Sequence, residues 1–300
     1  MGLLFPKVTS GIPGLDGMLG GGYTKNSIVA VAGSTGSGRT TFATQFLVEG
    51  YRQNKEPGLY LSFDEPKFSI FANMSGYDWN LPELEREKHV LFIEYPHNEL
   101  GDFMEQESSL LELIDTLGVE RVVFDSVTPL ALLSEGDARR RELTKLVNTI
   151  RRWGVSALLT AEDMHGSPGD IPRTTVGIEA LADGFIHLGW AHDGMRRTRT
   201  LEIVKMRGSA HEHILRPASI SDRGFSLVMD NPVAPALLPD AGAAKPKQKP
   251  AKAPEDSSDS KEKESSSKKQ ASSPKGHHSF GAPSIRPLSK SGAPFSPGRK

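Results

Sequence analysis

The chain has 300 residues, of which 37% are hydrophobic and none is cysteine. This composition predicts one sizeable hydrophobic core and excludes disulfides and thiolate metal sites. The sequence has no run of about 18 apolar residues and no basic-then-apolar leader at Met1, so we expect neither a membrane span nor a secretion signal. A cytoplasmic location is the default expectation.

The net charge of −1 conceals an asymmetry along the chain. Residues 241–300 hold 13 Lys and Arg against 5 Asp and Glu, a net +8, which leaves −9 for residues 1–240. Because an acidic body is a poor overall match for a phosphate backbone, nucleic-acid binding is possible but not favoured. The pattern of strands and helices stops at Pro232, and residues 241–300 hold too few apolar residues to offset the entropy of ordering. We therefore predict a folded domain over residues 1–235 and a disordered basic tail over 236–300.

The first 27 residues are punctuated by glycines around a short amphipathic segment, Leu15–Leu19. The pattern predicts turns around one or two helical turns. Such a segment could cover a ligand site, pack on a neighbouring subunit, or simply lead onto the first strand.

An apolar run at Ile28–Ala32 is followed by a glycine-rich loop and a helix predicted over Thr41–Arg52. Strand, loop and helix in this order are typical of a phosphate-binding loop. Glycine permits the backbone conformations and the close approach that wrapping an anion requires, and the loop amides and the positive end of the helix then attract the anion. The predicted nucleotide-binding residues are Gly33, Ser34, Thr35, Gly36, Ser37, Gly38, Arg39, Thr40 and Thr41, with Thr40 also a predicted Mg²⁺ ligand.

One position of this loop departs from the pattern GxxxxGK[ST]. Gly33, Gly38 and Thr40 fit the pattern, but Arg39 replaces the lysine. A lysine ammonium is a compact point charge, whereas a guanidinium is planar, bulkier and prefers two-pronged contacts. Binding of a nucleoside triphosphate is compatible with this change, while efficient hydrolysis is less secure.

Two further apolar runs end in carboxylates. Gly58–Phe63 is followed by Asp64 and Glu65, and Arg121–Ser126 contains Asp125. In an open α/β sheet, ligands bind at the carboxyl ends of the strands. Glu65 is our candidate for the group that takes a proton from an attacking water, and Asp125 for holding Mg²⁺, usually through water. Acidic residues also end strands merely to face water, so that alternative stays open for each run taken alone.

Strands and helices continue to alternate through the rest of the domain, which predicts an α/β fold with a mostly parallel sheet and helices on both faces. The helix predicted at Gly136–Trp153 has a basic face, which we interpret as solvated in preference to a nucleic-acid contact. The other predicted elements are a helix and loop at 67–88, a strand at His89–Glu94, a helix at Asp102–Thr116, a strand at Val155–Thr160, a helix leading into a strand at Ile178–Leu188, and an edge strand pair at Thr200–Met206 and Phe225–Met229.

Taken together, several stretches resemble the KaiC-like branch of the RecA-type ATPases, over roughly residues 7–230. They are TSGIPGLDGMLGGG, GSTGSGRTTFATQFL, YLSFDE, RVVFDS, VGIEALADGFIHL and VKMRGSAHEHILRPASISDRGFSLV. The resemblance implies a RecA-like P-loop NTPase fold that uses ATP and Mg²⁺. It also implies a homo-oligomeric ring, with a hexamer favoured, in which ATP lies between adjacent subunits.

The resemblance also implies roles for two pairs of residues. In the family, a carboxylate pair after the second strand activates the attacking water, which implies Glu65 as the base beside Asp64, although the pair is usually two glutamates. The family's KxRG segment senses the γ-phosphate in the neighbouring subunit's site, which implies trans-acting roles for Lys205 and Arg207. Two residues apart on a strand, these cations would face the same way. An exposed pair on an edge strand is the alternative.

The sequence favours a slowly hydrolysing ATPase that acts as a switch or signalling protein with an unidentified protein partner. A scaffold that binds nucleotide but barely hydrolyses it is one alternative, prompted by Arg39 and Asp64. A DNA-dependent recombinase or repair accessory is another, prompted by the basic helix and tail. Glu179 and Ala180 stand where the clock protein that names the family has a phosphorylated Ser and Thr, so autophosphorylation is not expected there.

Overall fold

The computed structural model describes residues 5–230, apart from 97–100, 102, 104, 165, 167–169 and 193. The predicted domain end at residue 235 and the predicted tail over 236–300 lie outside the described residues. Within the described part, no helix is both long enough and apolar enough to cross a membrane.

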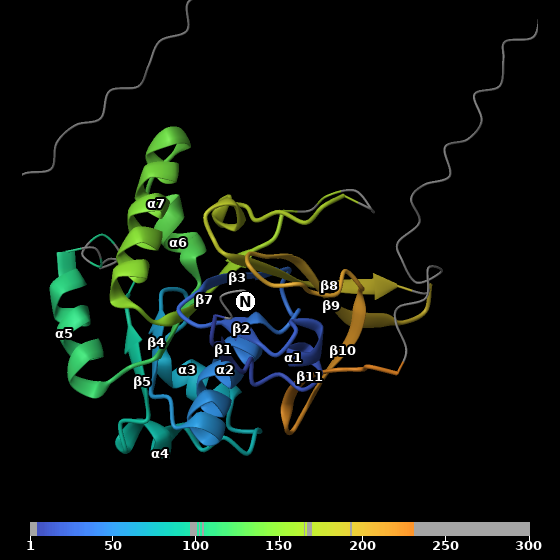
Figure 1. Cartoon of the computed structure of the whole chain (residues 1–300), viewed down its shortest axis with the longest axis horizontal. Coiled ribbons are helices and arrows are strands. Elements are labelled where there is room, and N and C mark those ends of the chain that lie inside the picture. The colour runs from blue at the N-terminus through green and yellow to red at the C-terminus, as the bar shows by residue number, and fades with distance from the viewer. Residues whose placement is uncertain are drawn as a thin grey trace, which may run out of the picture. The chain divides into compact units, whose positions relative to one another are not determined.

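A nine-stranded sheet forms the centre of the described part, in the order β11-β10-β9-β8-β3-β7-β6-β4-β5 (Figure 1). Neighbouring strands from β8 to β5 are parallel, whereas β9, β10 and β11 pair in antiparallel fashion. The prediction of an α/β fold with a mostly parallel sheet is therefore confirmed. The strands are β3 (Ile28–Gly33), β4 (Gly58–Ser62), β5 (Val90–Glu94), β6 (Arg121–Asp125), β7 (Ser156–Glu162), β8 (Gly184–His192), β9 (Arg197–Met206), β10 (Arg216–Ser221) and β11 (Gly224–Leu227).

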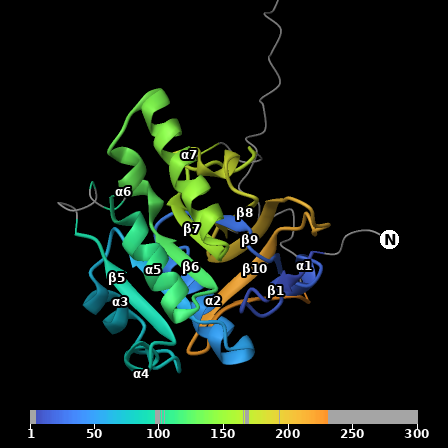
Figure 2. The same ribbon diagram turned by 60° about the vertical axis from the view of Figure 1, so that its left-hand side comes forward.

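Helices cover both faces of this sheet, as predicted (Figures 1 and 2). The helices on one face are α2 (Arg39–Asn54), α3 (Lys67–Asn73) and α4 (Leu81–Arg86), with the short α1 (Leu15–Met18) beside them. The helices on the other face are α5 (Glu107–Leu117), α6 (Val127–Leu132) and α7 (Gly136–Trp153). A 3-10 turn at Ile178–Ala180 precedes β8, and a separate two-stranded sheet pairs β1 (Lys7–Val8) with β2 (Tyr23–Thr24).

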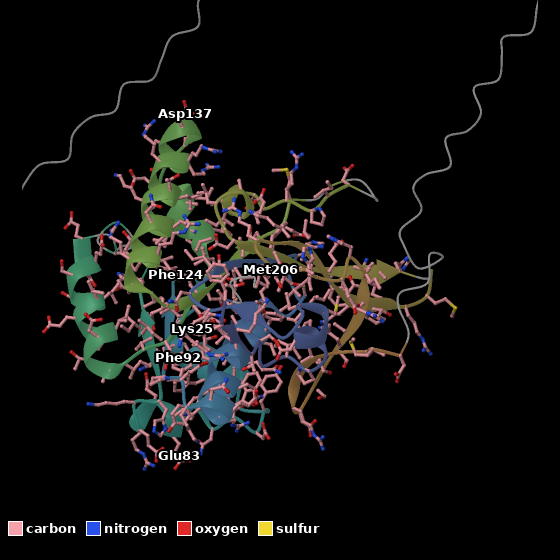
Figure 3. The ribbon with its side chains drawn as sticks, in the orientation of Figure 1. Lys25, Glu83, Phe92, Phe124, Asp137 and Met206 are labelled. Atoms are coloured by element: carbon pink, nitrogen blue, oxygen red, sulfur yellow. The ribbon has the colours of Figure 1, made fainter. Side chains whose placement is uncertain are left out.

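Alternation along the strands divides the core between the two faces. Val31 of β3 belongs to the cluster under α2, and Ala32 belongs to the cluster under α7. Because both faces of the central strands are covered, such strands are apolar throughout and not alternately polar. Phe92 and Phe124, both labelled in Figure 3, belong to the first and second cluster respectively, and Phe124 stacks on Trp153 of α7 at a ring-centroid distance of 6.1 Å.

The antiparallel edge differs from the sequence prediction. The segments 200–206 and 225–229 were expected to pair with each other, but β10 lies between them, with Pro217 opposite Thr200 and Ile220 opposite Phe225. Only one residue of β10 is buried, and proline is disfavoured inside strands, so the segment lacks the usual strand pattern. The strand-pair prediction was therefore wrong about the neighbours, though right about the edge of the sheet.

The N-terminal segment packs against its own chain. The Gln45 side chain of α2 donates hydrogen bonds to the carbonyls of Gly11, at 2.9 Å, and Phe225, at 3.0 Å. The backbone N–H of Leu227 donates to the carbonyl of Pro13 at 3.0 Å. These contacts join the segment to α2 and β11.

A buried arginine fixes the start of β6. The Arg121 side chain is fully buried and its Nε donates to Glu56 Oε2 at 2.6 Å, while one terminal nitrogen donates to the carbonyls of Thr9 and Phe46, each at 2.9 Å. Its guanidinium also lies over the Phe46 ring, 4.5 Å from the centroid. Burial lowers the pKa of Arg121, although the Glu56 carboxylate works against that shift. This one side chain therefore joins β6, α2 and the N-terminal segment.

Candidate functional site

The loop between β3 and α2 has a shape that only glycine permits at two positions. A Cβ on Gly33 would lie 2.5 Å from both the Leu188 carbonyl oxygen and the Ser37 hydroxyl oxygen. Gly38 has a φ of 101°, and a Cβ there would lie 2.7 Å from Ile220 Cδ1. Packing from β8 and β10 thus presses the backbone into a tight curve at the carboxyl edge of the sheet.

The start of α2 offers hydrogen-bond donors to a ligand. No side chain caps this 16-residue helix at Gly38, so its first backbone N–H groups lack a capping acceptor. The Ser37 hydroxyl is buried and, within the described part, has no hydrogen-bond partner. Uncapped amides, an unpartnered hydroxyl and a helix start favour an anion. The residues present therefore fit the phosphates of a nucleotide.

The loop residues differ in their exposure. Thr35 and Gly36 are exposed at the tip, and Ser34 and Thr40 are half-buried. Thr41 is buried, and its hydroxyl lies 3.4 Å from that of Tyr77, so Thr41 faces the core side of α2. Of the two threonines, Thr40 is the more accessible.

Arg39 turns back across the base of the loop. Its guanidinium donates to the carbonyl of Gly33 and, at 3.3 Å, to that of Ala161 in β7. The side chain thus joins the carboxyl ends of β3 and β7. A guanidinium has five N–H donors, so these two contacts leave others for a phosphate.

Asp125 ends β6 and is nearly buried, with a relative exposure of 8%. The Tyr60 hydroxyl donates to its Oδ2 and the Thr160 hydroxyl to its Oδ1. Burial, followed by the nearby Asp125 carboxylate, raises the pKa of Tyr60 well above its usual value, so that phenol stays a donor. Each carboxylate oxygen keeps a free lone pair, which suits a water of a hydrated Mg²⁺. The peptide bond that follows, Asp125–Ser126, is cis.

The carboxylates after β4 are held differently. Asp64 is exposed, whereas Glu65 is half-buried. The Ser69 hydroxyl and the Asn73 amide of α3, the latter at 2.6 Å, both donate to Glu65 Oε1. This leaves Oε2 without a donor among the described residues. Glu65 is thus the oriented member of the pair, with one oxygen fixed and one available to a water.

Lys205 and Arg207 lie near the amino ends of the parallel strands, here called the amino edge. The loop of the same chain lies at the carboxyl ends of these strands, the carboxyl edge. Met206 pairs with Gly184 at the start of β8, whereas Gly33 pairs with Leu188. Four to five strand residues therefore separate the two ends, about 15 Å at the spacing of a β-strand. The cation pair and the phosphate loop of one chain are placed at different edges.

Both cations contact the segment that precedes β8. Lys205 Nζ donates to the carbonyls of Glu179, at 3.0 Å, and Ala182, at 2.6 Å. Arg207 lies 3.5 Å from Asp183 Oδ1, an atom that also accepts from Arg151 at 3.1 Å. Burial lowers the pKa of Lys205, and the charge of Arg207 adds to that shift. Both side chains therefore contact the segment 179–183.

Two residues near the loop were missed by sequence reasoning. Arg199 Nε donates to the carbonyl of Gly36 at 3.1 Å, and its guanidinium lies over the Trp190 ring, 4.7 Å from the centroid. Both come from the antiparallel strands β8 and β9, far from the loop in sequence. The basic run before residue 200 was the available signal, but its position depends on the pairing of β9.

A half-buried charge cluster lies next to the loop. His187 sits opposite Ala32 of β3 and contacts Glu202 at 3.2 Å and Asp163 at 3.3 Å. Burial opposes its charge, but the hydrogen bonds to Asp163 and Glu202 outweigh burial and raise the pKa of His187 to about 9. A protonated His187 therefore joins β8, β9 and the end of β7 at neutral pH.

Comparison with known proteins supports the same architecture. A family model described as "ATPase: KaiC" matches residues 8–231. The circadian clock oscillator protein KaiC of Parasynechococcus marenigrum is 29% identical over 74% of this chain and 44% of its own length. The circadian clock protein KaiC3 of Synechocystis is 33% identical over 69% of this chain and 42% of its own length. The chain thus spans less than half of these clock relatives.

Single-domain relatives match over nearly their whole length. A UPF0273 protein of Thermotoga maritima is 28% identical, with 74% of this chain and 96% of that protein covered. Among solved structures, a KaiC-like protein from Pyrococcus horikoshii has a TM-score of 0.66 and 28% identity, covering 75% of this chain and 100% of its own. The family model, the relatives and the fold agree with the resemblance seen in the motifs: the chain belongs to the KaiC family of ATPases.

Proposed function

We propose that the chain is a slow, Mg²⁺-dependent ATPase that works as a ring, with each ATP bound between two adjacent copies. The observation that supports this most is the placement of the charged groups. The phosphate loop, Glu65 and Asp125 follow strands at the carboxyl edge, whereas Lys205 and Arg207 end at the amino edge. Within one chain the cation pair does not reach the loop, and in our proposal a second copy supplies it.

The residues of the carboxyl edge bind and orient the substrate. The loop amides and Arg39 hold the phosphates, and the Thr40 hydroxyl and Asp125 would hold the magnesium ion that neutralises phosphate charge. Glu65, fixed by Ser69 and Asn73, orients the attacking water and accepts its proton. The neighbouring copy's cations stabilise the charge that develops on the transferred phosphoryl group.

Two departures from the sequence pattern of the family support slow turnover. Arg39 is engaged with the carbonyls of Gly33 and Ala161, so binding a phosphate requires it to exchange or share these contacts. Asp64, shorter than the family's usual glutamate, is exposed. A switch that holds ATP for long periods and signals to a protein partner suits these features, and a hexameric ring is the favoured assembly.

A scaffold that binds ATP but hydrolyses almost none of it is the second candidate. The inward position of Arg39 favours it. A recombinase role has less support, because the basic face of α7 is partly neutralised: Arg151 pairs with Asp183, Arg152 with Glu107 and Lys145 with Glu142.

Two measurements on the full chain test the proposal. We expect size-exclusion chromatography with mass detection to show a larger assembly with ATP and Mg²⁺ than without, accompanied by slow phosphate release. Replacing Lys205 and Arg207 together by Ala should reduce turnover about a hundredfold, because charge stabilisation in the transition state is lost. Unchanged turnover in that variant would contradict the shared site, and a ring without phosphate release would favour the scaffold.

A further inference from the structure

A basic cavity lies apart from the phosphate loop. It has a volume of 330 Å³ and lies between the N-terminal half of α7 and the segment 173–181. Figure 3 labels Asp137 at the tip of this half of α7. The cavity is lined by Arg139, Arg140 and Arg173, and none of the loop residues 33–41 takes part.

The arginines of this cavity have no carboxylate partner within the described ranges. Arg151 and Arg152, on the same helix, each form an ion pair, whereas Arg139 donates only to the carbonyl of Ser134, at 3.0 Å. The acidic group of the lining is Glu179, whose carboxylate accepts from the backbone N–H of Thr174 at 3.3 Å and from its hydroxyl. Three guanidinium groups against one already engaged carboxylate leave a local excess of positive charge, which favours an anionic ligand.

The rest of the lining indicates the class of ligand. Guanidinium groups bind phosphate through paired hydrogen bonds, and Leu143, Val176 and Leu181 add an apolar surface for a carbon skeleton. The volume is at the low end of small-molecule sites. Single-stranded nucleic acid is normally bound by stacking on aromatic side chains, and the lining contains none. A small phosphorylated molecule therefore fits better than a nucleic acid.

One wall of the cavity also contacts Lys205, a member of the cation pair, and Arg151. The carbonyl of Glu179 accepts from Lys205, and that of Leu181 accepts from Arg151 at 3.2 Å. We propose that the cavity binds the phosphate group of a small phosphorylated molecule and that the backbone of residues 179–182 relays its occupancy to Lys205. The relay, though not the binding, rests on the proposed function.

Calorimetry with inorganic pyrophosphate as the probe tests the binding. Arg140 and Arg141 are adjacent, exposed residues of α7, and only Arg140 lines the cavity, so Arg140→Glu and Arg141→Glu form a matched pair. The wild type should show two classes of sites, the loop and the cavity. Arg140→Glu should weaken the cavity class about tenfold or more, while Arg141→Glu leaves both classes unchanged. Thermal melts establish that both variants are folded.

Three results would overturn the cavity site. The first is a single class of pyrophosphate sites in the wild type, and the second is equal weakening of binding by Arg140→Glu and Arg141→Glu. The third is that pyrophosphate binds only at the loop, while a single-stranded oligonucleotide binds in a way that Arg140→Glu abolishes. The relay has its own readout, since saturating pyrophosphate should change amide hydrogen exchange at residues 178–183 in the wild type but not in Arg140→Glu. No change in the wild type would remove the relay. Neither calorimetry nor hydrogen exchange depends on ATP turnover. The two measurements can therefore be interpreted even if the proposed hydrolysis fails.

Discussion

The carboxyl and amino ends of the parallel strands, called the carboxyl and amino edges, are built in different ways. At the carboxyl edge, Asp125 and Glu65 are fixed by neutral donors such as Tyr60 and Ser69, and the loop is fixed by packing. At the amino edge, Arg207 is 54% exposed and is held by an ion pair that water can compete with. One edge is preorganised within the chain, and the other presents the partly exposed charge of Arg207 at the surface. The difference is that expected between a substrate site and a surface that completes a neighbour's site.

The largest expected effect is at the carboxyl edge. Glu65→Gln should lower phosphate release about a thousandfold, because the amide cannot accept the water's proton. Calorimetric affinity for ATP and Mg²⁺ should change little, since the loop is untouched. Asp64→Asn is the matched control and should cost less, because Asp64 is exposed. A larger loss in Asp64→Asn would exchange the roles of the two carboxylates.

The second prediction concerns the stability of the fold and not the candidate site. It uses the ion pair between the buried Arg121 and Glu56. Arg121→Met should lower the free energy of unfolding by about 3 kcal/mol, because it leaves Glu56 and two backbone carbonyls without their donor. Urea denaturation at pH 7 measures this, and Arg86→Met, in an exposed pair, is the control. Equal effects in the two variants would show that Arg121 is not the anchor of β6.

The charge cluster beside the loop predicts a pH dependence of stability. The pKa of His187 is raised from 6.5 to about 9, so its stabilising contribution is fully present below about pH 6.5 and is lost as pH rises through 9. The free energy of unfolding should therefore fall by on the order of 2 kcal/mol across this window. Denaturation of the wild type and of His187→Gln measures it, and the variant should show a flatter profile. Parallel profiles would mean that His187 does not titrate as inferred.

The smallest expected effect concerns the orientation of Asp125. Tyr60→Phe removes one of the two hydroxyls on that carboxylate while preserving the ring that packs on Phe92. Loss of one buried hydrogen bond should raise the Mg²⁺ concentration needed for half-maximal turnover roughly tenfold. Phosphate release at varied Mg²⁺ concentrations checks this. An unchanged Mg²⁺ requirement in Tyr60→Phe would contradict a role of Asp125 in holding the metal.

Local patterns predicted most of the elements because their signals are continuous in sequence. The helix predicted at Gly136–Trp153 has those ends in the structure, since Gly154 adopts a φ of 65° that ends it. The strand β10 was missed because it contains Pro217 and exposed residues, which do not form a strand-like pattern in the sequence. The six-residue helix α6, directly after β6, was not predicted either.

The candidate site was predictable to the extent that it follows the strand ends. The loop, Glu65 and Asp125 each directly follow an apolar run, so their common edge could be inferred. Arg199 and Trp190 could not, because their contacts with the loop depend on the antiparallel register of β9. That register also sets Lys205 and Arg207 at the far edge, which is the fact on which the shared-site proposal depends.

Mixing two inactive variants tests the shared site most directly. Glu65→Gln keeps its cations but lacks the base, and Arg207→Ala keeps its base but lacks a cation. If adjacent copies complete each site, subunits exchanged in the presence of ATP and Mg²⁺ should form some interfaces with both groups intact, and phosphate release should exceed that of either variant alone. Phosphate release that stays at the level of the separate variants, in mixed assemblies shown by mass to contain both, would contradict the account.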